Sequence, residues 1–141
     1  MWHRNGAVLT GDSAHAVTPF IGQGANMAVT DGYVLGKLLA THLAAGYREG
    51  KGVWDAVERA SQEYEAMRVE STNHNVLESR TWGSWMVTDS WLKAWLVNTL
   101  SWITPGFYLV NQFSVYDEPN RTAITEAEEK WHKEVESRVA T

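Results

Sequence analysis

The first apolar run in the chain is short and has the form of a buried strand. It covers Ala7 to Thr10 and is bounded by Gly6 on one side and by Gly11-Asp12 on the other. Glycine and aspartate commonly follow a strand at a turn, so the sequence predicts one β-strand here. Because a lone strand leaves its backbone groups unpaired, we expect its partners to come from outside this chain or from a second copy of it.

Two amphipathic helices are predicted after this strand. Small and apolar residues recur three and four positions apart over 25–43, and Gly46 provides a stop. A second pattern with the same spacing runs from Val53 to Met67 and continues into the polar stretch 71–75. Both patterns are typical of helices that pack along one apolar face.

A third helix is predicted from Trp91 to Ile103. Asp89 or Ser90 is a suitable N-cap, and Pro105-Gly106 ends the pattern. The apolar residues 107–110 are expected to form a short connector.

The last predicted helix carries many charges. Thr125-x-x-Glu128 has the form of a capping box at its start. Its favourable i,i+4 pairs are Glu126/Lys130, Glu129/Lys133 and Glu134/Arg138, and its narrow apolar stripe is Ala127, Trp131, Val135 and Val139. The fold class expected from all these patterns is mostly α, with one short strand and about four helices.

Composition excludes several classes of function. With 12 basic and 17 acidic residues the net charge is -5, so nucleic acid is not an expected partner. The chain has no cysteine, which rules out disulfides and thiolate chemistry and is compatible with an intracellular, cytoplasmic location. No stretch is long and apolar enough for a secretory signal or a membrane span.

Tryptophan is unusually frequent and concentrated in one region. The chain has eight tryptophans in 141 residues, and those at 82, 85, 91, 95 and 102 fall in one short stretch. Aromatic residues at helical spacing favour a core or an interface, although an aromatic substrate or a weak membrane-surface association is also compatible with them.

The segment between the strand and the first helix carries the candidate chemistry. Asp12 follows the strand directly, where its carboxylate can accept hydrogen bonds from ligand hydroxyl groups. Gly22 and Gly24 allow a flat ligand to approach the backbone. The amides of residues 24–26 open the helix, and such a terminus favours an anion or a carbonyl that gains negative charge.

The sequence GDSAHAVTPFIGQGANMAVTD, from Gly11 to Asp31, resembles the second flavin-contacting motif of the single-component FAD-dependent hydroxylases, the p-hydroxybenzoate hydroxylase-like family. The resemblance continues more weakly to Tyr64-Glu65-x-x-Arg68. It implies that Asp12 binds the ribityl chain of FAD and that Pro19 lies beside the isoalloxazine ring. The backbone of Gly22, Gln23, Gly24, Ala25 and Asn26 would hold the pyrimidine end.

The resemblance also implies a cofactor, a reductant and a substrate class. The cofactor is FAD, the reductant is NAD(P)H, and the substrate is a small organic molecule of aromatic, polyketide or terpenoid type. The chain would be a C-terminal part of an α/β, Rossmann-like FAD-binding domain over 1–80, followed by a tryptophan-rich helical extension over 81–141. Family members begin with a strand–GxGxxG–helix unit, and this sequence contains no GxGxxG.

Two alternatives to a monooxygenase remain open at this point. The chain could be a non-catalytic helical remnant, or an accessory subunit of a split flavoenzyme whose other chain supplies the GxGxxG half. No side chain is proposed as catalytic, because His15 is expected to pack and to form hydrogen bonds rather than to transfer protons. No metal site is expected from the remaining histidines, which are His3, His42, His74 and His132.

Overall fold

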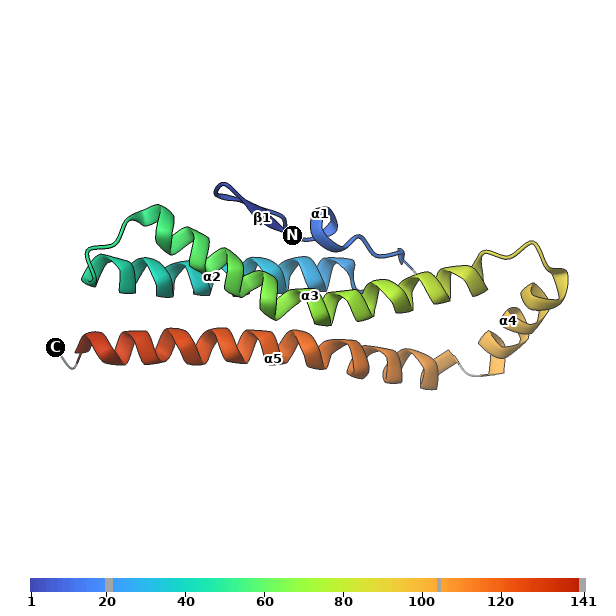
Figure 1. The fold of residues 1–141 in the computed structure, drawn as a ribbon. Helices are drawn as coiled ribbons and strands as arrows, with labels where there is room; N and C mark the ends of the chain where they lie inside the picture. Colours follow the sequence, from blue (N-terminus) through green and yellow to red (C-terminus); the bar gives the residue numbers. More distant parts are fainter. Residues whose placement is uncertain (20–21, 104, 140–141) are drawn as a thin grey trace.

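Three long helices define the computed structural model, which describes residues 1–19, 22–103 and 105–139. They are α2 (Gly24–Arg48), α3 (Val53–Met86) and α5 (Pro105–Val139). Figure 1 shows α3 running antiparallel to α2 and α5, with α4 (Trp91–Ile103) joining α3 to α5 at one end. The prediction of a mostly α chain is confirmed.

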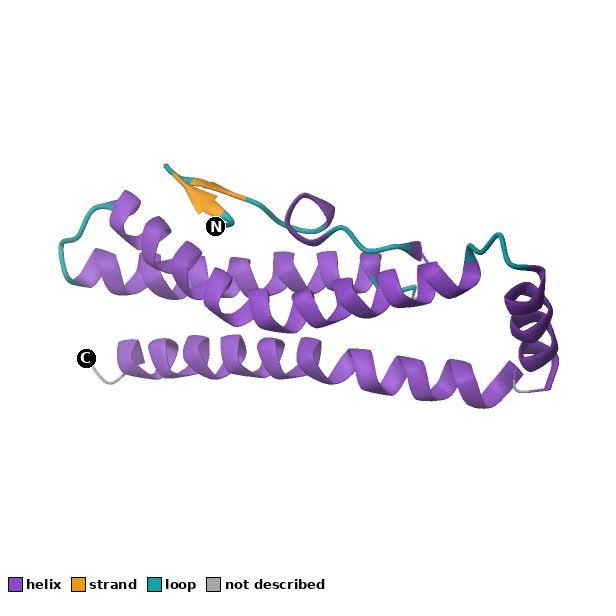
Figure 2. Cartoon of the chain, turned by 45° about the vertical axis from the view of Figure 1, so that its right-hand side comes forward, coloured by secondary structure: helices purple, strands orange, loops and turns teal. Residues whose placement is uncertain are grey.

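The predicted strand is one half of a β-hairpin. β1 (His3–Arg4) pairs antiparallel with β2 (Ala7–Val8). Asn5 and Gly6 join them with φ values of 51° and 80°, and two left-handed residues in succession form the tight turn that suits twisted strands. The expectation that the strand takes its partner from outside the chain is wrong, because the partner lies at the chain's own N-terminus (Figure 2).

The hydrophobic core lies where α2, α3 and α5 meet. Its buried members are Val34, Leu38, Ala60, Tyr64, Ala123 and Ala127. The two alanines are one helical turn apart on α5, which packs mainly on α2. Small side chains at this spacing allow the two backbones to approach closely. The C-terminal helix is thereby held against the helix that follows the glycine-rich loop.

The helix end predicted at Gly46 is misplaced by two residues. α2 continues to Arg48, and Gly50, with a φ of 64°, lies in the turn after it. Gly46 is buried inside the last turn, and a Cβ added there would lie 3.6 Å from the Cβ of Ala56. Position 46 therefore lies in the packing of α2 against α3 rather than at the end of the helix.

The polar stretch 71–75 does not end α3, which continues to Met86. Its buried positions keep the spacing of the apolar ones before them, and Arg68, Thr72 and Asn75 are at most 1% exposed. Thr72 donates a hydrogen bond from Oγ1 to the carbonyl oxygen of Arg68 at 2.7 Å. Thr72 and Asn75 thus continue the inner face of a longer helix.

The C-terminal predictions are partly confirmed. α4 has the predicted bounds, but α5 begins at Pro105, where the missing amide hydrogen costs no hydrogen bond. The connector predicted over 107–110 and the capping box at Thr125 are therefore wrong, because both lie inside α5. Thr125 donates from Oγ1 to the carbonyl of Arg121 at 3.0 Å, as a residue within a helix does.

The ion pairs predicted on the last helix have mixed outcomes. Nε of Arg138 lies 3.6 Å from Oε1 of Glu134, as predicted. Lys130 contacts Glu63 on α3. This contact joins α5 to α3 instead of bracing α5 alone. The expected apolar stripe is buried at Ala127 and half-buried at Trp131 and Val135.

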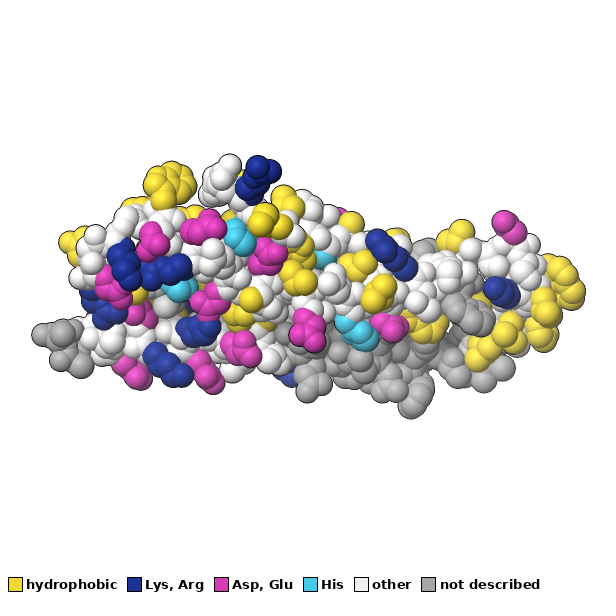
Figure 3. Space-filling model, in the orientation of Figure 1, with side chains coloured by type: hydrophobic (Ala, Val, Ile, Leu, Met, Phe, Trp, Pro, Cys, Tyr) yellow, Lys and Arg dark blue, Asp and Glu magenta, His cyan; other side chains and the backbone are white. Residues whose placement is uncertain are grey.

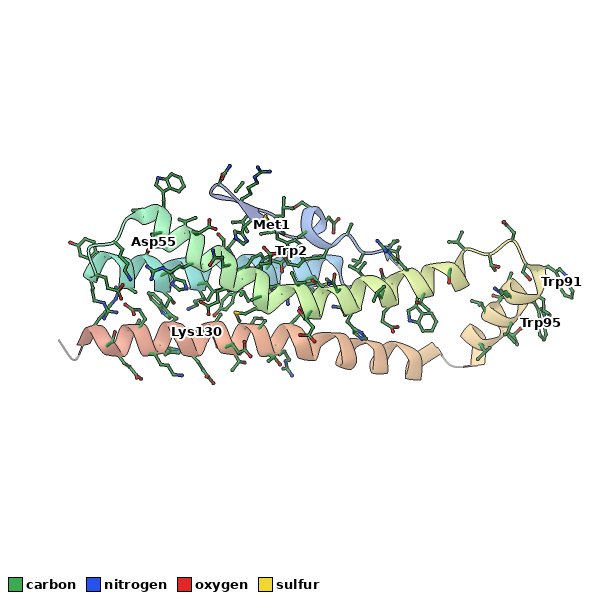
Figure 4. All side chains as sticks on the ribbon, viewed as in Figure 1. Met1, Trp2, Asp55, Trp91, Trp95 and Lys130 are labelled. Atoms are coloured by element: carbon green, nitrogen blue, oxygen red, sulfur yellow. The ribbon has the colours of Figure 1, made fainter. Side chains whose placement is uncertain are left out.

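α4 presents large apolar side chains to the surface. Trp91 is 79% exposed and Trp95 is 59% exposed, and both project at the far end of the molecule (Figure 4). Hydrophobic side chains also cover that end in the space-filling view (Figure 3). Within the described residues these two rings do not contribute to a core. No helix in the described part is long and apolar enough to cross a membrane.

The expected boundary between residues 80 and 81 falls within α3. Contacts of α5 with α2 and α3 also join the two expected parts. The division into 1–80 and 81–141 stays a prediction.

Candidate functional site

The turn predicted after the strand is a one-turn helix, α1 (Asp12–His15). Gly11 precedes it with a φ of 58°. Its carbonyl oxygen accepts hydrogen bonds from the amides of Ala14 and His15, at 2.9 and 3.0 Å. Asp12 opens this helix with an exposed side chain, so its carboxylate is accessible to a ligand.

Asp12 lies close to the start of α2. A Cβ added at Gly24 would stand 3.4 Å from Cγ2 of Val17 and 3.9 Å from Oδ1 of Asp12. The loop thus brings together the two ends of the predicted site, the carboxylate of Asp12 and the first amides of α2. A negative group near a helix N-terminus is favourable, because the free amides there carry partial positive charge.

The start of α2 is open. Gln23 provides no side-chain cap. Instead it is buried, and its Oε1 accepts a hydrogen bond from Nδ2 of Asn26 at 2.9 Å. The first amides of α2 are therefore not satisfied by the capping residue and are suited to a ligand. Ala25 and Asn26 are exposed, whereas Gly24 is half-buried.

The loop before α2 also leaves room for a ligand. Gly22 has a φ of 64° and donates its amide to the carbonyl of Pro19 at 3.1 Å. Apart from its chain neighbours, no atom of the described residues lies within 4 Å of the place where a Cβ of Gly22 would stand. Pro19 is exposed. Residues 20–21 of the motif lie outside the described residues.

A buried polar cluster lies beneath this loop and is centred on Asp31. Oδ2 of Asp31 accepts hydrogen bonds from the amide of Gly11 at 2.8 Å and from Nε2 of His15 at 2.5 Å. Oδ1 accepts a hydrogen bond from Nε of Arg68 at 2.8 Å. The side chains of Asp31 and Arg68 have no exposed surface, and that of His15 is 2% exposed. The expectation that His15 packs and forms hydrogen bonds agrees with this geometry.

The cluster favours an ionised Asp31. Burial alone raises the pKa of this carboxyl group, but hydrogen bonds from His15, Gly11 and Arg68 and the charge of Arg68 hold it below 3.8. An ionised carboxylate only accepts hydrogen bonds, so Nε2 of His15 carries the proton in their contact.

Two further contacts tie the cluster and the loop to the C-terminal half of the chain. Nη1 of Arg68 donates to Oδ1 of Asn120 on α5 at 3.0 Å. Thr18, in the middle of the loop, donates from Oγ1 to the carbonyl of Ser79 on α3 at 2.6 Å. The loop is therefore held at both Gly11 and Thr18 by groups on the long helices.

The sequence contained signals for Asp31 and Arg68 that were not used to place them in the site. Asp31 lies between Met27 and Val34 at the spacing of the buried face of α2, and Arg68 lies one turn after buried Tyr64. A charged residue on an apolar stripe predicts a buried partner of opposite charge. Within the described residues, no group of three or more histidine or acidic side chains is placed to hold a metal ion.

The first part of the chain matches a known family. A family model described as FAD binding domain covers residues 1–67. Residues 1–67 are thus similar to FAD binding domains. This matched segment contains every predicted site residue, from Asp12 to Asn26, and both Asp31 and Tyr64, whereas Arg68 directly follows it.

The curated relatives are named FAD-dependent monooxygenases. The protein adrH of Penicillium rubens is 39% identical over 93 residues, which is 66% of this chain and 20% of that protein. The protein ausM of Penicillium brasilianum is 38% identical over 79 residues, or 56% of this chain and 16% of that protein. The protein penM of Penicillium crustosum is 59% identical over 39 residues, or 28% of this chain and 8% of that protein. No solved structure matches the chain.

The resemblance to FAD-dependent monooxygenases is thereby confirmed, and the chain spans a fifth or less of the length of these relatives. The residues of the matched segment offer an exposed acceptor at Asp12, an uncapped helix start at Gly24 and, as far as the described residues go, open space at Gly22.

Proposed function

We propose that this chain supplies flavin contacts in an FAD-dependent monooxygenase that acts on a small organic substrate of aromatic, polyketide or terpenoid type. The observation that carries the proposal is the closeness of Asp12 to the start of α2 at Gly24, within the residues that match an FAD binding domain. A single ligand can therefore meet a carboxylate acceptor and a row of backbone donors. NAD(P)H is the proposed reductant, as the family resemblance implies.

Each predicted site residue has a distinct role in this proposal. The carboxylate of Asp12 accepts a hydrogen bond from a hydroxyl group of the ribityl chain. Pro19 lies against the isoalloxazine ring. The backbone from Gly22 through Gln23 and Gly24 to Ala25 and Asn26 lies along the pyrimidine end, where its amides donate hydrogen bonds.

The chemistry of oxygen transfer belongs to the bound FAD, and the chain's part is to position that cofactor and to stabilise its charge. The uncapped start of α2 favours negative charge on the pyrimidine edge, by about 0.3–2 kcal/mol on the scale of helix-terminus effects. Buried Gln23 keeps the first turn of α2 in place through its hydrogen bond to Asn26.

A second candidate is an accessory chain or a non-catalytic remnant. It applies if the polypeptide that carries this loop has no GxGxxG unit to bind the pyrophosphate. In the accessory form, a separate chain carrying the GxGxxG unit completes the FAD site. In the remnant form, the glycine-rich loop persists without binding flavin.

Titration of the purified chain with FAD, followed by amide NMR, separates these candidates. The proposed function predicts that the amide resonances of Gly24, Ala25 and Asn26 shift in a saturable way. Amide resonances at the far ends of α3 and α5 should shift less or not at all. Addition of the GxGxxG-containing part should tighten the binding if the site is shared between chains. Unchanged amide positions at all FAD concentrations would support the remnant.

A further inference from the structure

Asp12, the proposed ligand of the ribityl chain, lies in a short segment that is hydrogen-bonded to Asp31 at both ends. The amide of Gly11, the residue before Asp12, donates to Oδ2 of Asp31 at 2.8 Å. Nε2 of His15, at the end of α1, donates to the same oxygen at 2.5 Å. One carboxylate oxygen thus binds the chain on either side of Asp12 while the side chain of Asp12 remains exposed.

We infer that Asp31 is a positioning residue for the flavin site, which holds the turn from Gly11 to His15 so that the Asp12 carboxylate lies beside the first amides of α2. This inference rests on the proposed function, because it assigns Asp31 to the placement of a flavin ligand. Asp31 itself is buried, so in this inference it acts through the turn rather than by direct contact with the cofactor.

Asp31 can position Asp12 directly because it lies on α2, the helix whose first amides belong to the proposed site. Gly24 and Asp31 belong to the same helix, about two turns apart, so the distance between them is fixed by regular helix geometry. A bond from Asp31 to the Gly11 turn therefore sets the position of Asp12 relative to the amides at Gly24. Without that bond, α1 is linked to α2 through the loop and the contact of Thr18 with Ser79.

Asp31 is in turn held by α3 and, through it, by α5. Nε of Arg68 donates to Oδ1 of Asp31 at 2.8 Å, and Nη1 of Arg68 donates to Oδ1 of Asn120 at 3.0 Å. Asn120 is buried and lies well beyond the matched residues 1–67. The C-terminal helix α5 thus takes part in orienting the turn from Gly11 to His15 as well as in forming the core.

The test compares Asp31→Asn with a matched control, Glu134→Gln. Glu134 is also a nearly buried carboxylate paired with an arginine, since Nη2 of Arg48 lies 2.7 Å from its Oε2, but it joins α2 to α5 far from the loop. Amide hydrogen exchange is measured at Gly11 and His15 in the full chain without ligand. FAD affinity is measured for each variant in the wild-type and Asp12→Ala backgrounds.

We expect exchange at Gly11 to accelerate at least tenfold in Asp31→Asn and to stay unchanged in Glu134→Gln. FAD affinity should fall about tenfold in Asp31→Asn, the scale of one charge-assisted hydrogen bond. Most of that loss should vanish in the Asp12→Ala background, because Asp31 acts through Asp12. Equal losses in both backgrounds would overturn the inference, and so would unchanged exchange at Gly11.

Failure of the proposed function gives a different result. If the chain binds no FAD, or if Asp12→Ala leaves its FAD affinity unchanged, the flavin assignment is wrong. The positioning role of Asp31 for a flavin ligand is then overturned with it. Amide exchange at Gly11 still shows whether Asp31 holds the turn. If Asp31→Asn does not fold, His15→Leu serves as the second variant, because leucine cannot donate a hydrogen bond, so the change removes one of the two bonds to Oδ2 and keeps the ion pair with Arg68.

Discussion

Arg68 on α3 donates a hydrogen bond from Nε to Oδ1 of Asp31 on α2 at 2.8 Å, and neither side chain has exposed surface. This pair lies directly beneath the turn that carries Asp12. Two opposite charges without access to water are stabilised by each other and by the donors around them, which include the amide of Gly11. The pair therefore links the stability of the helical bundle to the geometry of the turn from Gly11 to His15.

Replacement of Arg68 by methionine should destabilise the chain strongly. Arg68→Met keeps much of the side-chain length but leaves the Asp31 carboxylate buried without its counter-charge, and loss of one member of a buried pair costs about 3–5 kcal/mol. Urea denaturation measures the change. Asp55→Asn is the control, because its ion pair with Arg59 at 2.9 Å is largely exposed and should be worth less than about 1 kcal/mol. Similar losses in both variants would contradict the account.

Acid should destabilise the chain through Asp31. Burial raises the pKa of this group, but the hydrogen bonds from His15, Gly11 and Arg68 and the charge of Arg68 bring it below 3.8. A carboxyl group with a lowered pKa in the folded state contributes stability that is fully present above its unfolded pKa and is lost as the pH falls through the folded value. The free energy of unfolding should therefore decrease as the pH is lowered from about 4. Asp31→Asn should show a shallower decrease, and an unaltered pH dependence would argue against this role.

A second pH effect is expected nearer neutrality. Burial, and then the charges of Arg59 and Lys130, lower the pKa of His42 below 6.5, although its Nε2 lies 2.8 Å from Oε2 of Glu63. Its contribution to stability is complete above the unfolded pKa and is lost as the pH falls through the lower folded value. Unfolding free energies measured from pH 7 downward should fall less steeply in His42→Gln. An equally steep fall in His42→Gln and in the unmodified chain would contradict this effect.

Two glycines of the loop should respond differently to alanine. Gly11 and Gly22 have φ values of 58° and 64°, so alanine at either site costs about 1–2 kcal/mol in backbone strain. The new Cβ would meet the Cβ of Ala28 at 3.2 Å in Gly11→Ala, whereas in Gly22→Ala it would meet no atom of the described residues within 4 Å beyond its chain neighbours. Thermal or urea denaturation should therefore show the larger loss for Gly11→Ala. An equal or smaller loss there would show that the turn has room to shift.

The fold could be predicted from the sequence where regular spacing decides the structure. α4 has its predicted bounds, because its apolar period is unbroken between suitable end residues. The hairpin was missed because the signal Asn5-Gly6 was not used, although asparagine and glycine both tolerate a positive φ. The start of the last helix was misplaced because the pattern at Thr125 fits a capping box, whereas the helix begins at Pro105. Local patterns of this kind do not reveal that a helix has already started.

The candidate site was only partly predictable from the sequence. Contacts within the loop motif follow from neighbouring residues, whereas contacts between helices depend on tertiary packing. Asp12 and Gly24 belong to a contiguous motif, and the structure brings them close together. The pairing of Asp31 with Arg68 and the bond from Arg68 to Asn120 join three helices. The relative rotation and height of packed helices decide such contacts, and these are set by tertiary packing rather than by spacing along one segment.

The affinity of the purified chain for FAD, compared between Asp12→Ala and Asp55→Ala, tests the central claim most directly. Both changes remove an exposed carboxylate from the first turn of a helix, but only Asp12 lies beside the start of α2. We predict that Asp12→Ala weakens FAD binding about tenfold, on the scale of one hydrogen bond to a charged group, while Asp55→Ala binds as the unmodified chain does. Equal FAD affinities in the two variants would contradict the assignment of this loop to flavin.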